Sequence, residues 1–242
     1  MTDLAPLLED LVTANRILAA EGIVDSFGHV SVRHPDNPQR YLLARARAPD
    51  CIEVDDIVTY ELDGTALDAR GRAPYRERFI HGAIYEARPD VQSVVHNHSP
   101  SVIPFGVTGC KLKPLMHVCS HIGHEVPVWD SQEKFGDTTL LVEDMEMGRD
   151  LARLLGNRPT ALMRGHGCVT VGSSIQYAVY IAIYLELAAK LQMQAMAMGP
   201  ITFLTPGEID RIVARMGPYS LNRAWENWCR RAGRPVRLMR EG

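Results

Sequence analysis

The chain has 242 residues, 46% of which are hydrophobic, and a formal net charge of −3 at pH 7. It is long enough to bury a substantial core, and its charge lacks the basic field typical of nucleic-acid or membrane-surface binding. We therefore expect a small-molecule partner, with no nucleic acid and no membrane. Five scattered cysteines without a Cys-x-x-Cys pair favour a reducing, cytoplasmic location, and the N-terminal segment does not match a signal peptide.

The first third of the chain predicts one helix and three strands. Apolar residues recur at helical spacing over residues 4–21, and Gly22 ends the pattern. Short apolar runs over residues 28–34 and 40–45 flank the turn sequence Pro-Asp-Asn-Pro, which predicts a hairpin. The sequence "DIVTYELDG" at residues 56–64 predicts a third strand that ends in a turn.

The middle of the chain places helices directly before strands. Residues 75–90 have helical spacing and lead through a Pro-Asp pair into a strand over residues 91–98. A second helix over residues 142–157 ends at a Gly-Asn pair. Strands over residues 160–164 and 168–172 follow it, and a Gly-His-Gly turn separates them.

The last third of the chain is predicted to be helical. The largely apolar residues 173–198 predict a long, mostly buried helix. A capping box from Thr205 to Glu208, with proline at the first helical position, predicts the start of a later helix. Because no internal repeat or long linker interrupts the chain, we expect one domain over residues 1–242 with a helical C-terminal tail over about 205–242.

Three histidines and a glutamate form a candidate metal site. Residues two apart in a strand face the same side, so His96 and His98 project together while Asn97 turns away. Neutral imidazole suits a divalent metal ion, but a catalytic ion usually takes three protein ligands. His166, in the tight turn between two glycines, is the candidate third ligand, and Glu77 is a candidate ligand or acid/base. Each feature has a plain alternative, because a His-x-His pair also arises by chance and a glutamate at a helix start also suits the helix dipole.

Taken together and in this order, these elements match a known family. The segments "ERFIHGAIYEARPDVQSVVHNHSPSV" and "ALMRGHGCVTVG" resemble the class II aldolase/adducin family, which includes L-fuculose-1-phosphate aldolase and L-ribulose-5-phosphate 4-epimerase. The resemblance runs over about residues 5–200. It implies an α/β fold with three layers, α/β/α, around a mixed, mostly antiparallel sheet. It also implies a homotetramer with active sites at subunit interfaces, in which His96, His98 and His166 bind a divalent metal beside Glu77.

The chain departs from the sugar-phosphate members of the family at three places. Those members carry small hydroxyl and backbone donors there, which cradle phosphate, whereas this chain carries His, Arg and Tyr. A guanidinium pairs with a planar carboxylate through two parallel hydrogen bonds, so we predict a carboxylate or phenolate substrate. The predicted substrate-binding residues are His29, Arg45, Arg47, Tyr75 and Arg76. The alternative for each arginine taken alone is ordinary surface charge.

Further histidines lie in the segment "MHVCSHIGHE". His117 and His121, one turn apart if this segment is helical, are predicted to point at the site. His124 is expected to be a plain surface or core residue. His81, four residues after Glu77, is a candidate for orienting a residue of the site without contacting the metal itself.

The departures favour the aromatic-carboxylate decarboxylase members of the family. We predict a carbon–carbon lyase that decarboxylates a hydroxylated aromatic or heteroaromatic carboxylate, as in aromatic catabolism, with the metal stabilising the enolate charge. The predicted catalytic residues are Glu77, His117 and His121, and the predicted cofactor is one Zn²⁺ or Mn²⁺ per subunit, with Fe²⁺ or Co²⁺ as alternatives. Two alternative functions stay open. One is a class II aldolase for a non-phosphorylated hydroxy-keto acid or a sugar phosphate, and the other is a non-catalytic, adducin-like structural module.

The C-terminal tail allows two interpretations. The family comparison predicts that Trp225, Trp228 and Arg230 pack near the site of a neighbouring subunit. The alternative is a surface helix that buries both tryptophans within its own domain.

Overall fold

A seven-stranded sheet runs through the computed structural model, which describes residues 2–239. The strand order is β3-β2-β1-β4-β7-β6-β5, and every neighbouring pair is antiparallel except β5 and β6, which are parallel. The strands are β1 (His29–Arg33), β2 (Arg40–Ala44), β3 (Ile57–Glu61), β4 (Ser93–Asn97), β5 (Val128–Trp129), β6 (Thr160–Met163) and β7 (Gly167–Gly172).

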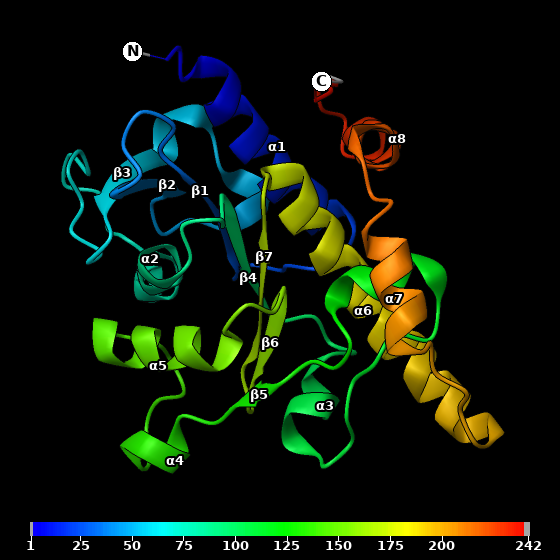
Figure 1. Ribbon diagram of the computed structural model, residues 1–242. Coiled ribbons are helices and arrows are strands. Elements are labelled where there is room, and N and C mark those ends of the chain that lie inside the picture. The colour runs from blue at the N-terminus through cyan, green and yellow to red at the C-terminus, as the bar shows by residue number, and fades with distance from the viewer. Residues whose placement is uncertain (1, 240–242) are drawn as a thin grey trace.

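Helices cover both faces of the sheet (Figure 1). One face packs against α2 and α5, and the other packs against α1, α6 and α8. The helices are α1 (Ala5–Ala20), α2 (Arg78–Ala87), α3 (Ile103–Val107), α4 (Gln132–Phe135), α5 (Met145–Leu155), α6 (Ile175–Met198), α7 (Pro206–Val213) and α8 (Pro218–Arg231), with 3₁₀ turns at Pro49–Cys51, Val54–Asp56 and His117–Ile122. The predicted α/β fold with three layers and a mixed, mostly antiparallel sheet is confirmed.

The predicted elements are all present, with ends that move by a few residues, except that the helical tail predicted over about 205–242 ends at Arg231 and its residues 240–242 lie outside the described residues. The hairpin forms as the antiparallel pair β1 and β2, and the helix predicted over residues 75–90 is α2. The sequence patterns did not indicate β5, α3 or α4, which have two, five and four residues. Elements this short carry too few residues for an apolar period to repeat. β5 is a strand because its two residues pair with β6.

Alternation along β1 gives the two faces of this strand different characters. Val30 and Val32 point into the core beneath α1 and α6. His29 and Ser31 point the other way and hydrogen-bond to His81 of α2. The face that α2 covers therefore carries buried polar side chains at β1.

The α2–α5 layer depends on close backbone contact at two glycines. A Cβ on Gly148 of α5 would lie 2.6 Å from the carbonyl oxygen of Phe79 and 2.9 Å from the Cβ of Ala83. A Cβ on Gly82 of α2 would lie 2.0 Å from the carbonyl oxygen of Leu62. Because real Cβ atoms do not approach so closely, only glycine permits this packing.

Helix starts in the structure match two sequence signals. The side chain of Thr205 accepts from the amide of Glu208, and Glu208 reaches back to the amide of Thr205, which confirms the predicted capping box of α7. Glu77 is the N-cap residue of α2, but its side chain makes no capping hydrogen bond. Its carboxylate is thus available for another role.

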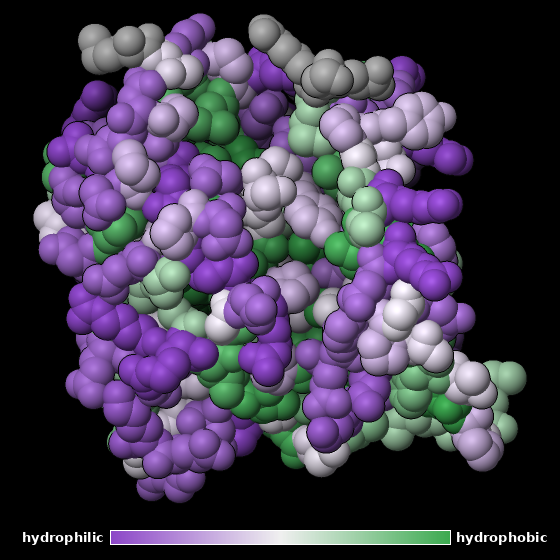
Figure 2. All heavy atoms as spheres, viewed as in Figure 1, coloured by the Kyte–Doolittle hydropathy of each residue, from purple (hydrophilic) through white to green (hydrophobic). Residues whose placement is uncertain are grey.

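The C-terminal half of α6 projects beyond the sheet. Figure 2 shows pale and green atoms at this projecting end, in contrast to the polar surface over most of the view. The side chains there include Met193, Met196 and Met198, which are 36%, 51% and 88% exposed. None of the helices within residues 2–239 is long and apolar enough to cross a membrane.

Helix α8 packs against its own chain. Trp225 and Trp228 are 1% and 5% exposed, and Trp228 lies with its ring centroid 6.1 Å from those of Tyr180 and Tyr184 on α6. Arg230 forms an exposed ion pair with Glu226. The structure thus matches the second interpretation of the tail, a helix that buries both tryptophans in its own domain.

The glycine contact between α2 and α5 can be tested by adding one methyl group. We expect Gly148→Ala to lower the free energy of unfolding by about 1–3 kcal/mol, because the methyl group overpacks a backbone contact and outweighs the gain in helix propensity. Gly207→Ala in α7 is the matched control, because a Cβ there meets nothing within 4 Å. Urea unfolding followed by circular dichroism measures both variants, and equal stabilities would contradict the packing argument.

Candidate metal centre

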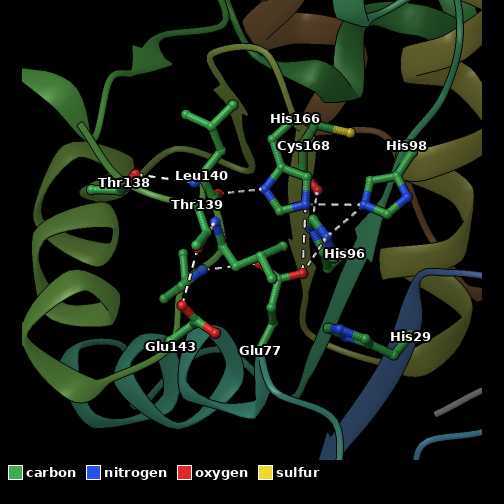
Figure 3. Close-up of polar contacts among 12 residues, drawn as sticks. His29, Glu77, His96, His98, Thr138, Thr139, Leu140, Glu143, His166 and Cys168 are labelled. Carbon is green, nitrogen blue, oxygen red and sulfur yellow. Dashed lines mark hydrogen bonds and ion pairs between the residues drawn. The ribbon is translucent and has the colours of Figure 1, made fainter.

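Four side chains from three parts of the fold converge on one point. Glu77 precedes α2, His96 lies in β4, His98 follows β4, and His166 occupies the turn between β6 and β7. One ligand atom from each lies within 4.8 Å of those of the other three. Figure 3 shows the three imidazoles and the carboxylate directed toward one another. The structure therefore brings together the predicted metal set, including Glu77.

The spacing of these atoms fits a single divalent ion. The Nε2 atom of His98 lies 3.1 Å from Nε2 of both His96 and His166. Oε2 of Glu77 lies 3.4 Å from Nε2 of His96 and 3.5 Å from Nε2 of His166. A tetrahedral ion with ligands at about 2.0–2.1 Å separates neighbouring ligand atoms by about 3.3–3.4 Å. The measured separations are close to this value.

Backbone carbonyl groups fix which nitrogens face the centre. Nδ1 of His96 lies 3.1 Å from the carbonyl oxygen of Cys168, and Nδ1 of His166 lies 2.9 Å from that of Leu140. A carbonyl oxygen only accepts, so each Nδ1 carries a hydrogen, and each Nε2 faces the centre, where a neutral ring offers a lone pair to a metal ion. Lone pairs that face one another at this distance repel, and a cation between them removes the repulsion.

A backbone amide holds the carboxylate oxygen of Glu77 that faces away from the histidines. Oε1 accepts from the amide of Val142 at 3.0 Å, which leaves Oε2 facing the histidines. Burial acts to raise the pKa of Glu77, but the neighbouring His96 and His166 outweigh burial and hold it well below the ordinary range. The carboxylate is ionised and suited to hold a cation.

Two of the histidines have pKa values shifted in opposite directions. Burial, with smaller contributions from His96 and His166, lowers the pKa of His98 to about 4, so its ring is neutral near pH 7. Burial also acts to lower the pKa of His166, but the Glu77 carboxylate outweighs it and the pKa is raised. A proton and a metal ion therefore compete for the inner edge of His166.

Glycine permits the approach of β7 to the end of β4. A Cβ on Gly167 would lie 2.2 Å from the carbonyl oxygen of Asn97 and 2.8 Å from Cδ2 of His98. Gly165 has a φ of +67°, which the tight turn requires. Both glycines that flank His166 thus serve the geometry of the centre, as the sequence pattern predicted.

A cavity of about 630 Å³ opens beside the metal centre. Among its lining residues are four of the five predicted substrate-binding residues, with three of the four ligands: His29, Arg47, Tyr75, Arg76, Glu77, His98 and His166. The cavity also touches Ser26, Phe27 and Leu141, which the sequence analysis did not identify. Because these three lie in irregular segments, no repeating pattern marks them.

The fifth predicted substrate-binding residue, Arg45, is not among the residues that line this cavity. Its Nε atom donates to Asp56 at 2.5 Å, and Arg47 donates to the other carboxylate oxygen of Asp56 at 2.5 Å. Burial acts to raise the pKa of Asp56, but hydrogen bonds from a backbone amide and from both arginines lower it to about 2. Asp56 thus orients both guanidinium groups, and of the two residues only Arg47 lines the cavity. Arg76 is 78% exposed at the side chain, beside Glu143.

The structure places His117 and His121 in a different cavity. This second cavity has a volume of about 1220 Å³ and shares no lining residue with the first. Nδ1 of His121 lies 2.8 Å from the hydroxyl of Tyr177. Within one chain these two histidines are not brought to the metal ligands, so their role as proton donors stays a prediction. His124 is exposed and pairs with Asp210, as expected of a surface residue.

The backbone of residues 138–142 is a part of the centre that sequence reasoning missed. It supplies the carbonyl of Leu140 to His166 and the amide of Val142 to Glu77. Leu140 has a φ of +65°, which is uncommon for a residue with a side chain. The hydroxyl oxygens of Thr138 and Thr139 accept hydrogen bonds from the amides of Leu140 and Leu141 and hold this segment. Backbone groups carry no residue-type signal, so the sequence could not have revealed them.

Comparison with known proteins agrees with this geometry. A family model described as "Class II Aldolase and Adducin N-terminal domain" matches residues 9–193. A decarboxylase named tropJ from Talaromyces stipitatus is 34% identical, with 90% of this chain and 91% of that protein covered. A 3,4-dihydroxyphthalate decarboxylase from Arthrobacter keyseri is 28% identical, with coverage of 90% and 91%.

Among solved structures, an L-fuculose 1-phosphate aldolase from Glaciozyma antarctica is similar. It has a TM-score of 0.76 and 26% identity, with 96% of this chain and 92% of that chain covered. Decarboxylases and aldolases both cleave carbon–carbon bonds. The prediction of a carbon–carbon lyase is therefore confirmed.

Removing one imidazole tests the metal centre. We expect purified His96→Ala to lose most of the roughly one metal ion per chain that the unchanged protein would carry, because the three imidazole ligands with fixed spacing become two. His124→Ala is the control, since it removes an exposed histidine that pairs only with Asp210. Elemental mass spectrometry after loading with Zn²⁺ or Mn²⁺ measures both, and equal metal content would contradict the assignment.

Proposed function

Because the chain belongs to the class II aldolase and adducin family, we propose that it is a divalent-metal-dependent decarboxylase of a hydroxylated aromatic or heteroaromatic carboxylate. The observation that carries the proposal is the cavity over the ligand cluster, which is lined by His29, Arg47, Tyr75 and Arg76. The names of two relatives, a decarboxylase and a 3,4-dihydroxyphthalate decarboxylase, support the same reaction class.

The donor set suits several divalent ions. Three imidazoles and one carboxylate accept Zn²⁺ or Mn²⁺, with Fe²⁺ or Co²⁺ as alternatives, at one ion per subunit. When bound, such an ion supplies a Lewis acid for the hydroxyl and carboxylate oxygens of the substrate. The chain itself must bind the substrate, orient it and handle one proton.

Arginine and tyrosine side chains would bind and orient the substrate. The planar guanidinium groups of Arg47 and Arg76 match the geometry of a planar carboxylate. The compact, strongly hydrated ammonium group of a lysine would match it less well. The hydroxyl of Tyr75 donates to the carbonyl of Arg47, which ties these two walls of the cavity together. The rings of Tyr75 and His29, with centroids 4.6 Å apart and planes tilted by 43°, provide two aromatic faces against which a substrate ring would pack.

Decarboxylation replaces CO₂ with a proton at one ring carbon, so the reaction needs one acid. The low pKa of Glu77 makes its carboxylate better suited to hold the ion or to accept the proton of a ring hydroxyl. His117 and His121 remain the proposed donors. Because they lie outside the metal cavity of the same chain, this role requires that another subunit supply them.

We further propose a homotetramer located in the cytoplasm. The exposed methionines at the projecting end of α6 form an apolar surface of the kind that subunit contacts cover. The separate cavity that holds His117 and His121 is consistent with active sites shared between subunits. The five free cysteines fit a reducing compartment.

Product analysis tests the reaction. We expect metal-loaded protein, incubated with a panel of hydroxylated aromatic carboxylates and hydroxy-keto acids, to release CO₂ from at least one aromatic acid. Mass spectrometry measures the products, and chelator-treated protein is the control. Release of an aldehyde or pyruvate would instead establish the aldolase alternative, which the similar aldolase structure favours. No product from any compound would argue for a non-catalytic module.

The contrast between Arg45 and Arg47 tests the cavity. With the substrate found by that screen, we expect Arg47→Ala to raise KM roughly tenfold or more, since a hydrogen bond from a charged donor is lost. Arg45→Ala is the matched control, because both arginines bind Asp56 but only Arg47 lines the cavity. A larger KM increase in the control would place the substrate elsewhere.

A further inference from the structure

Four buried polar side chains form a continuous hydrogen-bonded chain beneath the sheet. The hydroxyl of Tyr85 lies 2.8 Å from Oγ of Ser31, and this Oγ lies 2.6 Å from Nδ1 of His81. Nε2 of His81 lies 2.6 Å from Nδ1 of His29. None of the four residues is more than 3% exposed. The chain ends at His29, which lines the cavity over the metal ligands.

Local geometry explains how the chain forms. His29 and Ser31 are two residues apart in β1 and therefore share a face of the sheet. His81 and Tyr85 are four residues apart in α2, one turn of helix, and therefore share a face of the helix. Because α2 packs on that face of β1, the two pairs interleave.

The inner end of the chain sets the direction of every hydrogen bond in it. Within residues 2–239, the only side-chain partner of the Tyr85 hydroxyl is Oγ of Ser31. If Tyr85 accepted from Ser31, its own hydrogen would be buried without an acceptor, which is costly. Tyr85 therefore donates to Ser31, and the Ser31 hydroxyl in turn donates to Nδ1 of His81.

The direction then passes through the two imidazoles. An imidazole nitrogen that accepts a hydrogen bond carries no hydrogen, so a ring that accepts at Nδ1 is neutral. A neutral His81 that accepts at Nδ1 carries its hydrogen at Nε2, and it donates this hydrogen to Nδ1 of His29. His29 must then carry its own hydrogen at Nε2, for which the structure gives no hydrogen-bond partner within residues 2–239.

Two features suit Tyr85 to the role of hydrogen-bond donor. Burial raises the pKa of Tyr85 above its ordinary value, so the phenol does not ionise. The guanidinium of Arg33 lies 4.7 Å from the centre of the Tyr85 ring and strengthens the phenol as a donor. This series of hydrogen bonds cannot deliver a proton to the cavity, because Tyr85 would become a buried phenolate. Its action is therefore positional.

We propose that Tyr85, Ser31 and His81 are positioning residues that lock His29 as the tautomer with hydrogen on Nε2, so that His29 presents a hydrogen-bond donor to the substrate. The imidazole of His29 extends from β1 toward the ligand cluster (Figure 3). The substrate atom that meets it is an oxygen without hydrogen, which is a carboxylate or phenolate oxygen. This inference rests on the proposed function for the identity of the substrate, but the tautomer itself does not.

Neutron diffraction from deuterated crystals of the metal-loaded protein tests the lock directly. We expect nuclear density for deuterium on Nε2 of both His29 and His81, and none on Nδ1 of either ring. Deuterium on Nδ1 of His29, alone or together with Nε2, would overturn the proposal. This result does not depend on any substrate, so a lock found in a protein that fails to decarboxylate would refute the proposed function and leave the lock standing.

Two variants of His81 test the consequence for catalysis with the substrate identified by product analysis. His81→Leu removes the donor to His29, and we expect KM to rise roughly tenfold with kcat and metal content nearly unchanged. His81→Gln restores an amide donor, and we expect it to recover most of this loss. Tyr60→Phe is the control for the loss of a buried polar group, since the hydroxyl of this nearby buried tyrosine has no hydrogen-bond partner within the described residues. Equal KM values for the Leu and Gln variants would contradict the donor role.

Discussion

The close contact between β7 and the end of β4 sets the position of the metal centre. The two strands pair in antiparallel register, with His96 opposite Val169 and Asn97 opposite Cys168. This register places the carbonyl of Cys168 where it orients His96, and it brings the turn that holds His166 beside His98. The contact exists because Gly167 has no Cβ. A strand pairing therefore determines where three imidazoles meet.

Helix α2 connects the metal centre to the interior of the protein. Its N-cap residue, Glu77, supplies the carboxylate at the centre, and His81 and Tyr85 extend the polar chain that ends at His29. The helix is held at this depth by its glycine contact with α5 through Gly148. Because buried polar groups are costly unless they are fully paired, the position of α2 must be well defined. Packing between two helices and hydrogen bonding under the sheet thus support each other.

The arginines show how tertiary contacts divide residues that look alike in the sequence. Arg45 and Arg47 are two residues apart, and both bind Asp56. Arg45 directly follows β2 and does not line the cavity. Arg47 lies in the next segment, which forms part of the cavity wall. The carboxylate of Asp56 neutralises part of their charge and fixes their orientation. The cavity is therefore less positive than a count of nearby arginines indicates, and more rigid.

Local sequence patterns were enough to predict the elements with a long repeating pattern and the residue types of the metal set, and the family resemblance predicted the three-layer fold. Two features of the metal set are local. The spacing of His96 and His98 and the glycines around His166 depend only on the geometry of these strands and their turn. The folded chain was needed to identify the groups that support the centre, such as the backbone at Leu140 and Val142, and the predicted residues that lie apart from it, such as His117. The physical reason is that hydrogen bonds to backbone groups and contacts between distant segments depend on the packing of the whole chain, which no local pattern records.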